Sequence, residues 1–169
     1  MKCPACGNIM EKVTVGGITI DVCKGGCGGM WFDRFELEKV DEPQESAGES
    51  LLDIERDESI AVDHTKRCMC PTCDDTIMMR HFFSVKREVV VDECPKCAGI
   101  WLDYGELGRI RKQFTTEQER KKAAQEYFSD IFDKELKGMR EESEEQREKA
   151  RTLTGIFRFL SPRSDTSRK

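Results

Sequence analysis

The chain lacks the features that define several broad classes of protein. None of its 169 residues belongs to an apolar run approaching the 18 residues of a membrane span, so no transmembrane segment is expected. Cys3 precedes any apolar stretch of the kind found in signal peptides, and we therefore expect a reducing, cytoplasmic location. The two histidines, His64 and His81, stand at no spacing that would complete a metal-ligand set, so both are interpreted as non-ligands.

The chain also lacks an excess of positive charge, since its net charge is −5. Residues 1–40 carry five basic and five acidic side chains, and residues 67–113 carry eight and seven. The acidity belongs to residues 41–66, with two basic against nine acidic groups, while residues 147–169 hold seven basic against two. Neither cysteine-bearing segment has the basic excess that drives phosphate binding by counterion release, so a protein partner is favoured and nucleic acid is the alternative.

Apolar residues are scarce as well. Hydrophobic residues make up 37% of the chain and charged residues 36%, so much of the chain is solvated surface. The chain contains two repeats of about 40 residues, and a hydrophobic core of that size seldom holds a fold by itself. Metal ions or disulfides are therefore needed to stabilise each repeat.

Cysteine is abundant, and eight of the nine cysteines form a pattern that occurs twice. Each copy has a Cys-Pro-x-Cys pair and a second close pair, with 16 residues between the pairs in the first copy and 20 in the second. Two thiolate pairs at this separation suit a tetrahedral zinc ion, and four thiolates leave no open position for water. We predict two Zn²⁺ ions, one per copy, with these ligands: Cys3, Cys6, Cys23 and Cys27 in the first copy, and Cys70, Cys73, Cys94 and Cys97 in the second.

Three alternatives to this interpretation remain open at the level of sequence. Iron in place of zinc would make the chain a rubredoxin-like electron carrier, because such sites also use two Cys-x-x-Cys turns. Disulfides are disfavoured by the expected reducing compartment. A cross-braced arrangement that shares metals between copies is disfavoured because each copy has its own predicted hairpin and tryptophan. The ninth cysteine, Cys68, is interpreted as an incidental surface thiol.

Local patterns predict a β-hairpin and a short helix in each copy. In the first, apolar residues alternate over 18–22 after Gly16-Gly17, which suits a two-residue turn; in the second, residues 77–83 and 85–92 form the hairpin. We expect Trp31 and Trp101 each to seal the small core of its own copy.

Two carboxylate pairs are interpreted as structural. Asp33 with Glu36, and Asp103 with Glu106, have the spacing of helix N-terminal caps, in which the Asp side chain accepts a backbone N–H and the Glu bonds back. They therefore need no catalytic role, and we expect no enzyme activity.

The second copy resembles the transcription factor IIB-type zinc ribbon family of small proteins. Its Cys-Pro-x-Cys turn, hairpin and Cys-x-x-Cys turn lead into Gly-Ile-Trp-Leu-Asp-x-Gly-Glu-Leu over residues 99–107. The first copy departs twice, because three residues separate Cys23 from Cys27 and Phe35 replaces the glycine before Glu36. The resemblance covers about 80 residues and implies zinc and contact with protein or nucleic acid, in a transcription- or translation-related setting, without a defined reaction.

The C-terminal third predicts a helix with an apolar face. Thr116 and Glu119 have the spacing of a capping box, and apolar residues then recur at helical spacing. This face predicts an interface, either onto the ribbons or with a second chain, and its length favours a homo-oligomer formed through residues 117–140. Its members are Ala124, Tyr127, Phe128, Ile131, Phe132 and Leu136.

The predicted fold is a small metal-stabilised α+β protein, with two tandem zinc ribbons, each a β-hairpin plus a short helix, before a long C-terminal α-helical region. The predicted function is a non-enzymatic zinc-binding adaptor. Its predicted segments are ribbon 1 over 1–40, a mostly flexible acidic linker over 41–66, ribbon 2 over 67–113, an amphipathic to charged helix over 114–152, and a short apolar-basic segment with a disordered tail over 153–169.

Overall fold

The structure is a computed structural model that describes the backbone of residues 1–160 and the side chains of residues 1–151. The chain divides into two compact units, which meet between Ala124 and Gln125. The predicted tail lies outside the described residues from 161 onward. The backbone of 153–160 is helical and continues the helix before it.

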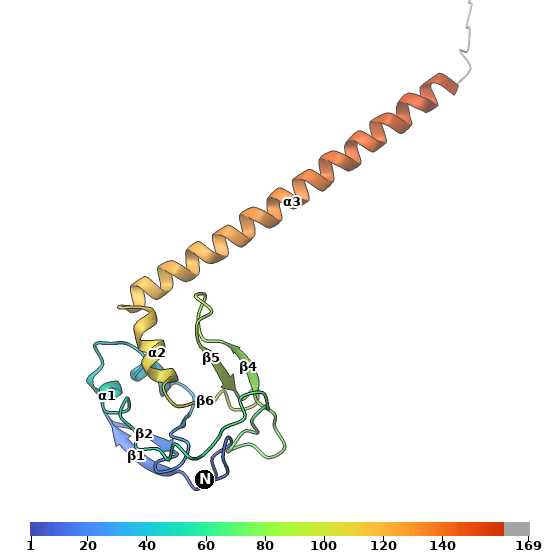
Figure 1. Ribbon diagram of the computed structural model, residues 1–169. Coiled ribbons are helices and arrows are strands. Elements are labelled where there is room, and N and C mark those ends of the chain that lie inside the picture. Colours follow the sequence, from blue (N-terminus) through green and yellow to red (C-terminus); the bar gives the residue numbers. More distant parts are fainter. Residues whose placement is uncertain (161–169) are drawn as a thin grey trace, which may run out of the picture. The chain divides into compact units, whose positions relative to one another are not determined.

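Both ribbons belong to one antiparallel six-stranded sheet in the first unit (Figure 1). Its strand order is β1-β2-β3-β6-β5-β4. The ribbons join edge to edge because β3 pairs with β6 along its whole length. The two ribbons therefore share one sheet and do not fold as two separate domains. The strands are β1 Glu11–Val15, β2 Ile18–Val22, β3 Met30–Phe32, β4 Met79–Phe82, β5 Val90–Glu93 and β6 Ile100–Leu102.

The junction between the ribbons has approximate two-fold symmetry. Trp31 lies opposite Trp101 in the β3–β6 pairing, while Met30 faces Leu102 and Phe32 faces Ile100. An antiparallel pair centred on equivalent residues relates each ribbon to the other by a half-turn. Each position in one ribbon therefore has a counterpart in the other.

Two core clusters result from the alternation of side chains along these strands. Met30 and Phe32 belong to an aliphatic core, which also takes residues from β2, β5 and the helices. Trp31 belongs to a second cluster, the knuckle core, together with Trp101, Met10 and Met78. The knuckle core also contains the cysteines of both ribbons, so neither ribbon has a core of its own.

The predicted capping pairs form only in part. The Asp33 amide donates to Glu36 Oε2 and the Asp103 amide donates to Glu106 Oε2, both at 2.9 Å. The aspartate side chains do not cap a helix, which corrects the sequence interpretation, because each accepts the indole N–H of the tryptophan two residues before it. The helices that follow are the 3-10 turn η1 (Leu37–Lys39) in ribbon 1 and α2 (Glu106–Gln113) in ribbon 2.

The acidic segment 41–66 is packed against the ribbons, in contrast to the flexible linker that its composition predicts. Leu51 is 2% exposed and joins the aliphatic core, just after the short helix α1 (Ser46–Glu49). Arg111 of α2, itself 4% exposed, donates to the backbone carbonyls of Val40, Pro43 and Glu45 at 2.6–3.1 Å. A buried guanidinium with several carbonyl acceptors outweighs the compositional tendency to disorder.

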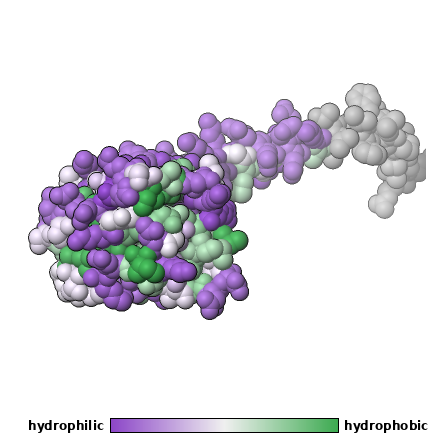
Figure 2. All heavy atoms as spheres, turned by 60° about the horizontal axis from the view of Figure 1, so that its bottom comes forward, coloured by the Kyte–Doolittle hydropathy of each residue, from purple (hydrophilic) through white to green (hydrophobic). Residues whose placement is uncertain are grey.

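The helix α3 spans Glu117–Leu160. At its start, the Glu119 amide donates to Thr116 Oγ1 at 3.2 Å, while the Glu119 carboxylate accepts the Thr115 amide at 2.9 Å. None of the described helices is long and apolar enough to cross a membrane. Figure 2 shows hydrophobic surface in separate patches among hydrophilic side chains on one face of the molecule.

Candidate metal centres

The structure brings the eight predicted ligands together in the two predicted sets. In each set, the four Sγ atoms lie within 4.8 Å of one another. Cys3 and Cys27 are 3.5 Å apart at sulfur, as are Cys6 and Cys23, and the Cys70–Cys97 separation is 3.8 Å. A tetrahedron with metal–sulfur bonds of about 2.3 Å requires sulfurs about 3.8 Å apart.

These distances exclude two of the three alternatives that the sequence leaves open, the disulfides and the cross-braced arrangement. A disulfide needs sulfurs about 2.0 Å apart, and all nine cysteines are free thiols. Each set draws its four cysteines from one ribbon, so the cross-braced arrangement is wrong. The distances do not distinguish zinc from iron, because both ions take four thiolates in a tetrahedron.

A tight turn at the base of each hairpin positions the first two cysteines of each set. The Cys6 amide points at Cys3 Sγ at 3.4 Å, and the Cys73 amide points at Cys70 Sγ at 3.2 Å. Gly7 follows the first turn at a φ of 80°, which a residue with a Cβ rarely adopts. Backbone N–H groups directed at sulfur stabilise the thiolate form that binds metal.

The longer Cys23-x-x-x-Cys27 turn has a structural use. Its additional residue, Gly25, has a φ of 62° and donates its amide to the Glu55 carbonyl of the acidic segment at 2.8 Å. The next residue, Gly26, accepts the Asp57 amide, also at 2.8 Å. A Cβ at Gly26 would lie 2.4 Å from Cys23 Sγ, so only glycine fits there. The expanded turn therefore binds the acidic segment by its backbone.

The electrostatics of each set favour a bound cation. A hydrogen bond from Cys27 lowers the pKa of Cys3 to about 5, and the same bond raises the pKa of Cys27. Burial, and then a hydrogen bond with Cys6, raises the pKa of Cys23 to about 12. Thiols this close cannot all ionise without a partner of opposite charge, and a divalent ion provides it.

The second set behaves in the same way. Burial raises the pKa of Cys97 to about 12 and also opposes ionisation of Cys94, but the backbone amides of Cys97 and Lys96 bring the pKa of Cys94 down to about 7. One acidic thiol beside thiols of raised pKa is thus common to both sites.

Each tryptophan packs against the ribbon to which it does not belong. This corrects the expectation that each tryptophan seals the small core of its own ribbon. A Cβ at Gly99 would lie 2.1 Å from Cζ2 of Trp31, and a Cβ at Gly29 would lie 2.1 Å from Cζ2 of Trp101. Both indoles are 1% exposed. The exchange follows from the β3–β6 pairing, which no local sequence pattern indicates. It links the turn that carries one metal set to the tryptophan of the other ribbon.

The remaining candidate ligands stand outside both sets within the described residues. His64 Nδ1 is 2.7 Å from Asp103 Oδ2, and His81 Nε2 is 2.7 Å from Glu93 Oε2. Cys68 is half-buried against the knuckle core, and its carbonyl accepts the Met78 amide at 3.0 Å. Cys68 is therefore packed into the fold, which corrects its interpretation as an incidental surface thiol. Burial raises the pKa of Cys68 to about 11.

Glu106 makes stability depend on pH. Burial raises the pKa of Glu106 from its ordinary 4.5 to about 7, against the Asp103 amide, which lowers it. The folded state binds this proton more tightly than the unfolded state, so stability falls as pH rises from about 4.5 to about 7. We expect Glu106→Gln to raise the free energy of unfolding by about 1–3 kcal/mol at pH 8 and by less at pH 5.5, measured by denaturant titration with metal in excess.

Glu36 supplies the matched control for this substitution. It makes the same bond to a backbone amide in ribbon 1 but is less buried than Glu106. Glu36→Gln should therefore change stability little at either pH. An equal gain from Glu106→Gln at both pH values would contradict the burial argument.

Comparison with known proteins places both halves of the sheet in one family. The family described as transcription factor zinc-finger, of TFIIB-type zinc ribbons, matches the chain over residues 2–42 and again over residues 69–112. The two matched segments together make up half of the chain, and each contains one four-cysteine set. No curated protein and no solved structure matches.

Proposed function

The chain belongs to the family of TFIIB-type zinc ribbons, in two tandem copies, and on this premise we propose that it is a non-enzymatic adaptor that binds a protein partner. Two zinc ions, each held by the four cysteines of one ribbon, would fix the shared sheet that carries the binding surfaces. The family suggests a transcription- or translation-related setting. Nine free thiols suit a reducing, cytoplasmic compartment.

Zinc is favoured over iron by the family to which both ribbons belong. Both sets provide four cysteine sulfurs at the spacing of a tetrahedral ion, and family members are described as zinc ribbons. When bound, zinc would supply structural cross-linking, because four thiolates fill its coordination sphere. A filled sphere gives no position at which a substrate or water binds, which supports a role without catalysis. A rubredoxin-like iron centre is the alternative.

The observation that carries the partner proposal is the apolar face of α3. Phe128, Phe132, Leu136 and Met139 recur at helical spacing and are each 48–63% exposed. Exposed aromatic side chains in a continuous row mark an interface more often than a solvated face. We propose that this face pairs with a second copy through residues 117–140. Nucleic acid is the alternative partner for the chain.

Native mass spectrometry of the full chain tests this proposal in one measurement. We expect two zinc ions per chain and the mass of a dimer. Phe128→Ser with Phe132→Ser should return the mass to one chain with both zinc ions retained, because these residues lie far along the chain from any cysteine. Iron in the sites would overturn the zinc assignment, and a monomeric native chain would overturn self-association. Tight binding to random DNA or RNA that weakens steeply with salt would favour the nucleic-acid alternative.

A further inference from the structure

Two surface grooves of the first unit correspond to each other by the approximate two-fold symmetry. The open groove has a volume of about 480 Å³ and is lined in part by Phe35, Leu37, Ala98 and Ile100. The filled groove has a volume of about 220 Å³ and is lined at the four counterpart positions by Gly105, Leu107, Gly28 and Met30. The filled groove is smaller because three residues of the acidic segment also line it, namely Leu51, Leu52 and Ile54.

The filled groove shows how this scaffold binds a peptide segment, which turns at residues 51–53 and has no regular secondary structure at 54–57. Two leucines and an isoleucine of the acidic segment line it, and the guanidinium of Arg56 stacks over the Tyr104 ring at 4.1 Å. The backbone then bonds to the metal-binding turn: the Glu55 carbonyl accepts the Gly25 amide, and the Asp57 amide donates to the Gly26 carbonyl, each at 2.8 Å. Apolar insertion and backbone pairing are the elements of peptide recognition.

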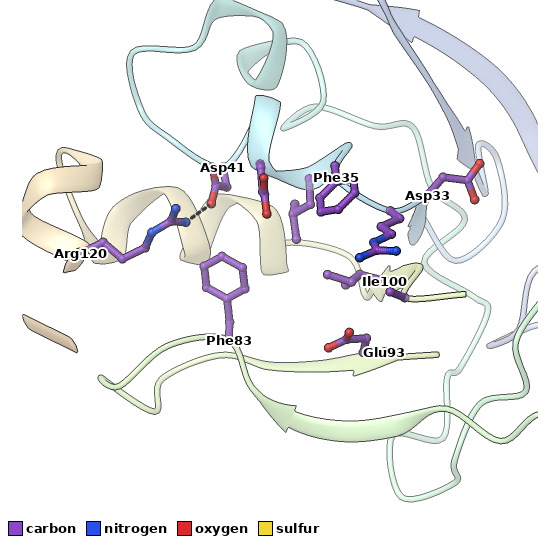
Figure 3. Close-up of a pocket in the computed structure, with 11 residues that line it drawn as sticks. Asp33, Phe35, Asp41, Phe83, Glu93, Ile100 and Arg120 are labelled. Atoms are coloured by element: carbon purple, nitrogen blue, oxygen red, sulfur yellow. Dashed lines mark hydrogen bonds and ion pairs between the residues drawn. The ribbon is translucent and has the colours of Figure 1, made fainter. Parts of the chain in front are cut away.

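The open groove has the apolar walls and the backbone acceptor of the filled groove, but no counterpart of the Gly25 amide, because its metal-binding turn is one residue shorter. Figure 3 shows Phe35 on one side and Phe83 and Glu93 on the other, with Ile100 between Phe35 and Glu93. The counterpart of Gly26 is Lys96, and no backbone amide of residues 1–160 donates to the Lys96 carbonyl. The groove therefore offers apolar walls and a backbone acceptor where the filled groove already uses both.

Phe35 is an unusual residue for its position, because the fold gives both Phe35 and its counterpart a left-handed backbone. Its φ is 67°, and its ring is 57% exposed, whereas its counterpart is Gly105 at a φ of 80°. Bulky residues avoid left-handed conformations, and those that adopt them concentrate at binding sites. An exposed aromatic ring held in this conformation at the rim of an apolar groove indicates a ligand contact.

The two grooves differ in the charge at their rims. This difference predicts the charge of the ligand residue that takes the place of Arg56. The counterpart of Tyr104, on which Arg56 stacks, is Arg34, and its guanidinium lies 4.5 Å from the Phe35 ring centroid. A ligand residue at the place of Arg56 would meet a positive charge. Three of the four acidic residues that also line the open groove, Asp33, Asp41 and Glu93, already bond to Trp31, Arg120 and His81 respectively. The fourth, Glu38, is exposed to solvent.

We propose that the open groove binds a short segment of a protein partner in the conformation of residues 51–57, with aliphatic residues in the places of Leu51, Leu52 and Ile54 and an acidic residue in the place of Arg56. The proposal rests on the adaptor function and specifies its ligand. The aliphatic residues enter between Phe35 and Ile100. The acidic residue pairs with Arg34, and a backbone amide one residue later donates to the Lys96 carbonyl.

Titration of the full zinc-loaded chain with two synthetic peptides tests this proposal. The first has the sequence of residues 51–57 with Arg56→Glu, and the second has the natural sequence of 51–57. We expect the first to bind with NMR shifts at Phe35, Ala98 and Ile100, and the second to bind about fivefold more weakly because it loses the charge pair with Arg34. No shift at these residues at millimolar peptide would overturn the proposal.

Two protein variants test whether Phe35 contacts the peptide or only supports the fold. Phe35→Gly should abolish peptide binding while the melting temperature stays equal or rises, because glycine relieves the left-handed conformation. Tyr104→Ala, the matched change at the filled groove, should leave binding to the open groove unchanged. Binding that survives Phe35→Gly, or shifts centred on Gly28 and Gly105, would place the peptide elsewhere and overturn the proposal.

The same samples distinguish this proposal from the adaptor function. A chain that forms dimers through α3 but binds neither peptide would overturn the groove proposal and leave the adaptor function standing. Shifts at Phe35 and Ile100 on concentrating the chain without peptide would identify a second copy as the occupant, which also overturns the proposed partner.

Discussion

Cys94→Ser should unfold both ribbons, although it removes a ligand from only the second. Cys94 is fully buried in the knuckle core, which holds the cysteines and tryptophans of both ribbons in one cluster. A structural zinc ion contributes roughly 10–16 kcal/mol, while a whole domain is stable by about 5–15 kcal/mol. Loss of the second site therefore removes more free energy than the shared sheet has available. The same logic predicts that chelation unfolds residues 1–124 in one transition.

NMR chemical-shift dispersion and near-ultraviolet circular dichroism measure this outcome. We expect collapse of the ribbon 1 resonances and loss of the Trp31 signal together with that of Trp101. Helical signal from α3 should persist, supported by ion pairs such as Glu117–Lys121 and Glu145–Lys149 at 2.7 Å. Cys68→Ser is the control and should retain both metals. Ribbon 1 resonances that stay unchanged in Cys94→Ser would show that the ribbons fold independently.

Gly99→Ala should destabilise the sheet by about 3 kcal/mol, far more than an alanine costs at an ordinary site. The added Cβ would lie 2.1 Å from Cζ2 and 2.5 Å from Cη2 of Trp31, and the indole, 1% exposed, has no room to withdraw. Gly29→Ala should have the same effect through Trp101, because the two positions are counterparts. Denaturant unfolding of the zinc-loaded chain measures both.

A double-mutant cycle identifies the cause of that loss. Trp31→Leu is itself destabilising, but adding it to Gly99→Ala should cost less than the sum of the single changes, because the clash is gone. Gly138→Ala is the matched control: its Cβ would meet nothing within 4 Å, and it lies within α3, where alanine favours helix by about 1 kcal/mol. Additive losses from Gly99→Ala and Trp31→Leu would contradict the exchanged packing.

The sequence predicts those features that depend on neighbours along the chain. The thiol sets follow from cysteine spacing, because a short turn brings two sulfurs to one point, and the Gly16-Gly17 hairpin follows from local conformation. The α3 helix follows from apolar residues at helical spacing. Half of each capping box also follows, since the Glu36 and Glu106 carboxylates bond back three residues as their spacing predicts.

The features that sequence reasoning misses involve partners far apart along the chain. The Asp33 and Asp103 side chains are a local exception: instead of capping a helix, each accepts the indole N–H of the tryptophan two residues before it. Residues 41–66 resemble a flexible linker, but Arg111, up to 68 positions away, donates to the carbonyls of Pro43 and Glu45. Such interactions leave no period or spacing in the sequence, and each needs the fold before it can form.

By itself, then, the sequence determined two four-thiol sites, two hairpins and a long C-terminal helix, because each depends on residues close along the chain. The tertiary structure decided that the ribbons share one sheet, that each tryptophan seals the opposite ribbon, and that only one of two equivalent grooves is filled. The physical reason is the pairing of β3 with β6. Backbone hydrogen bonds between two three-residue strands create the symmetry, and neither strand's sequence specifies its partner.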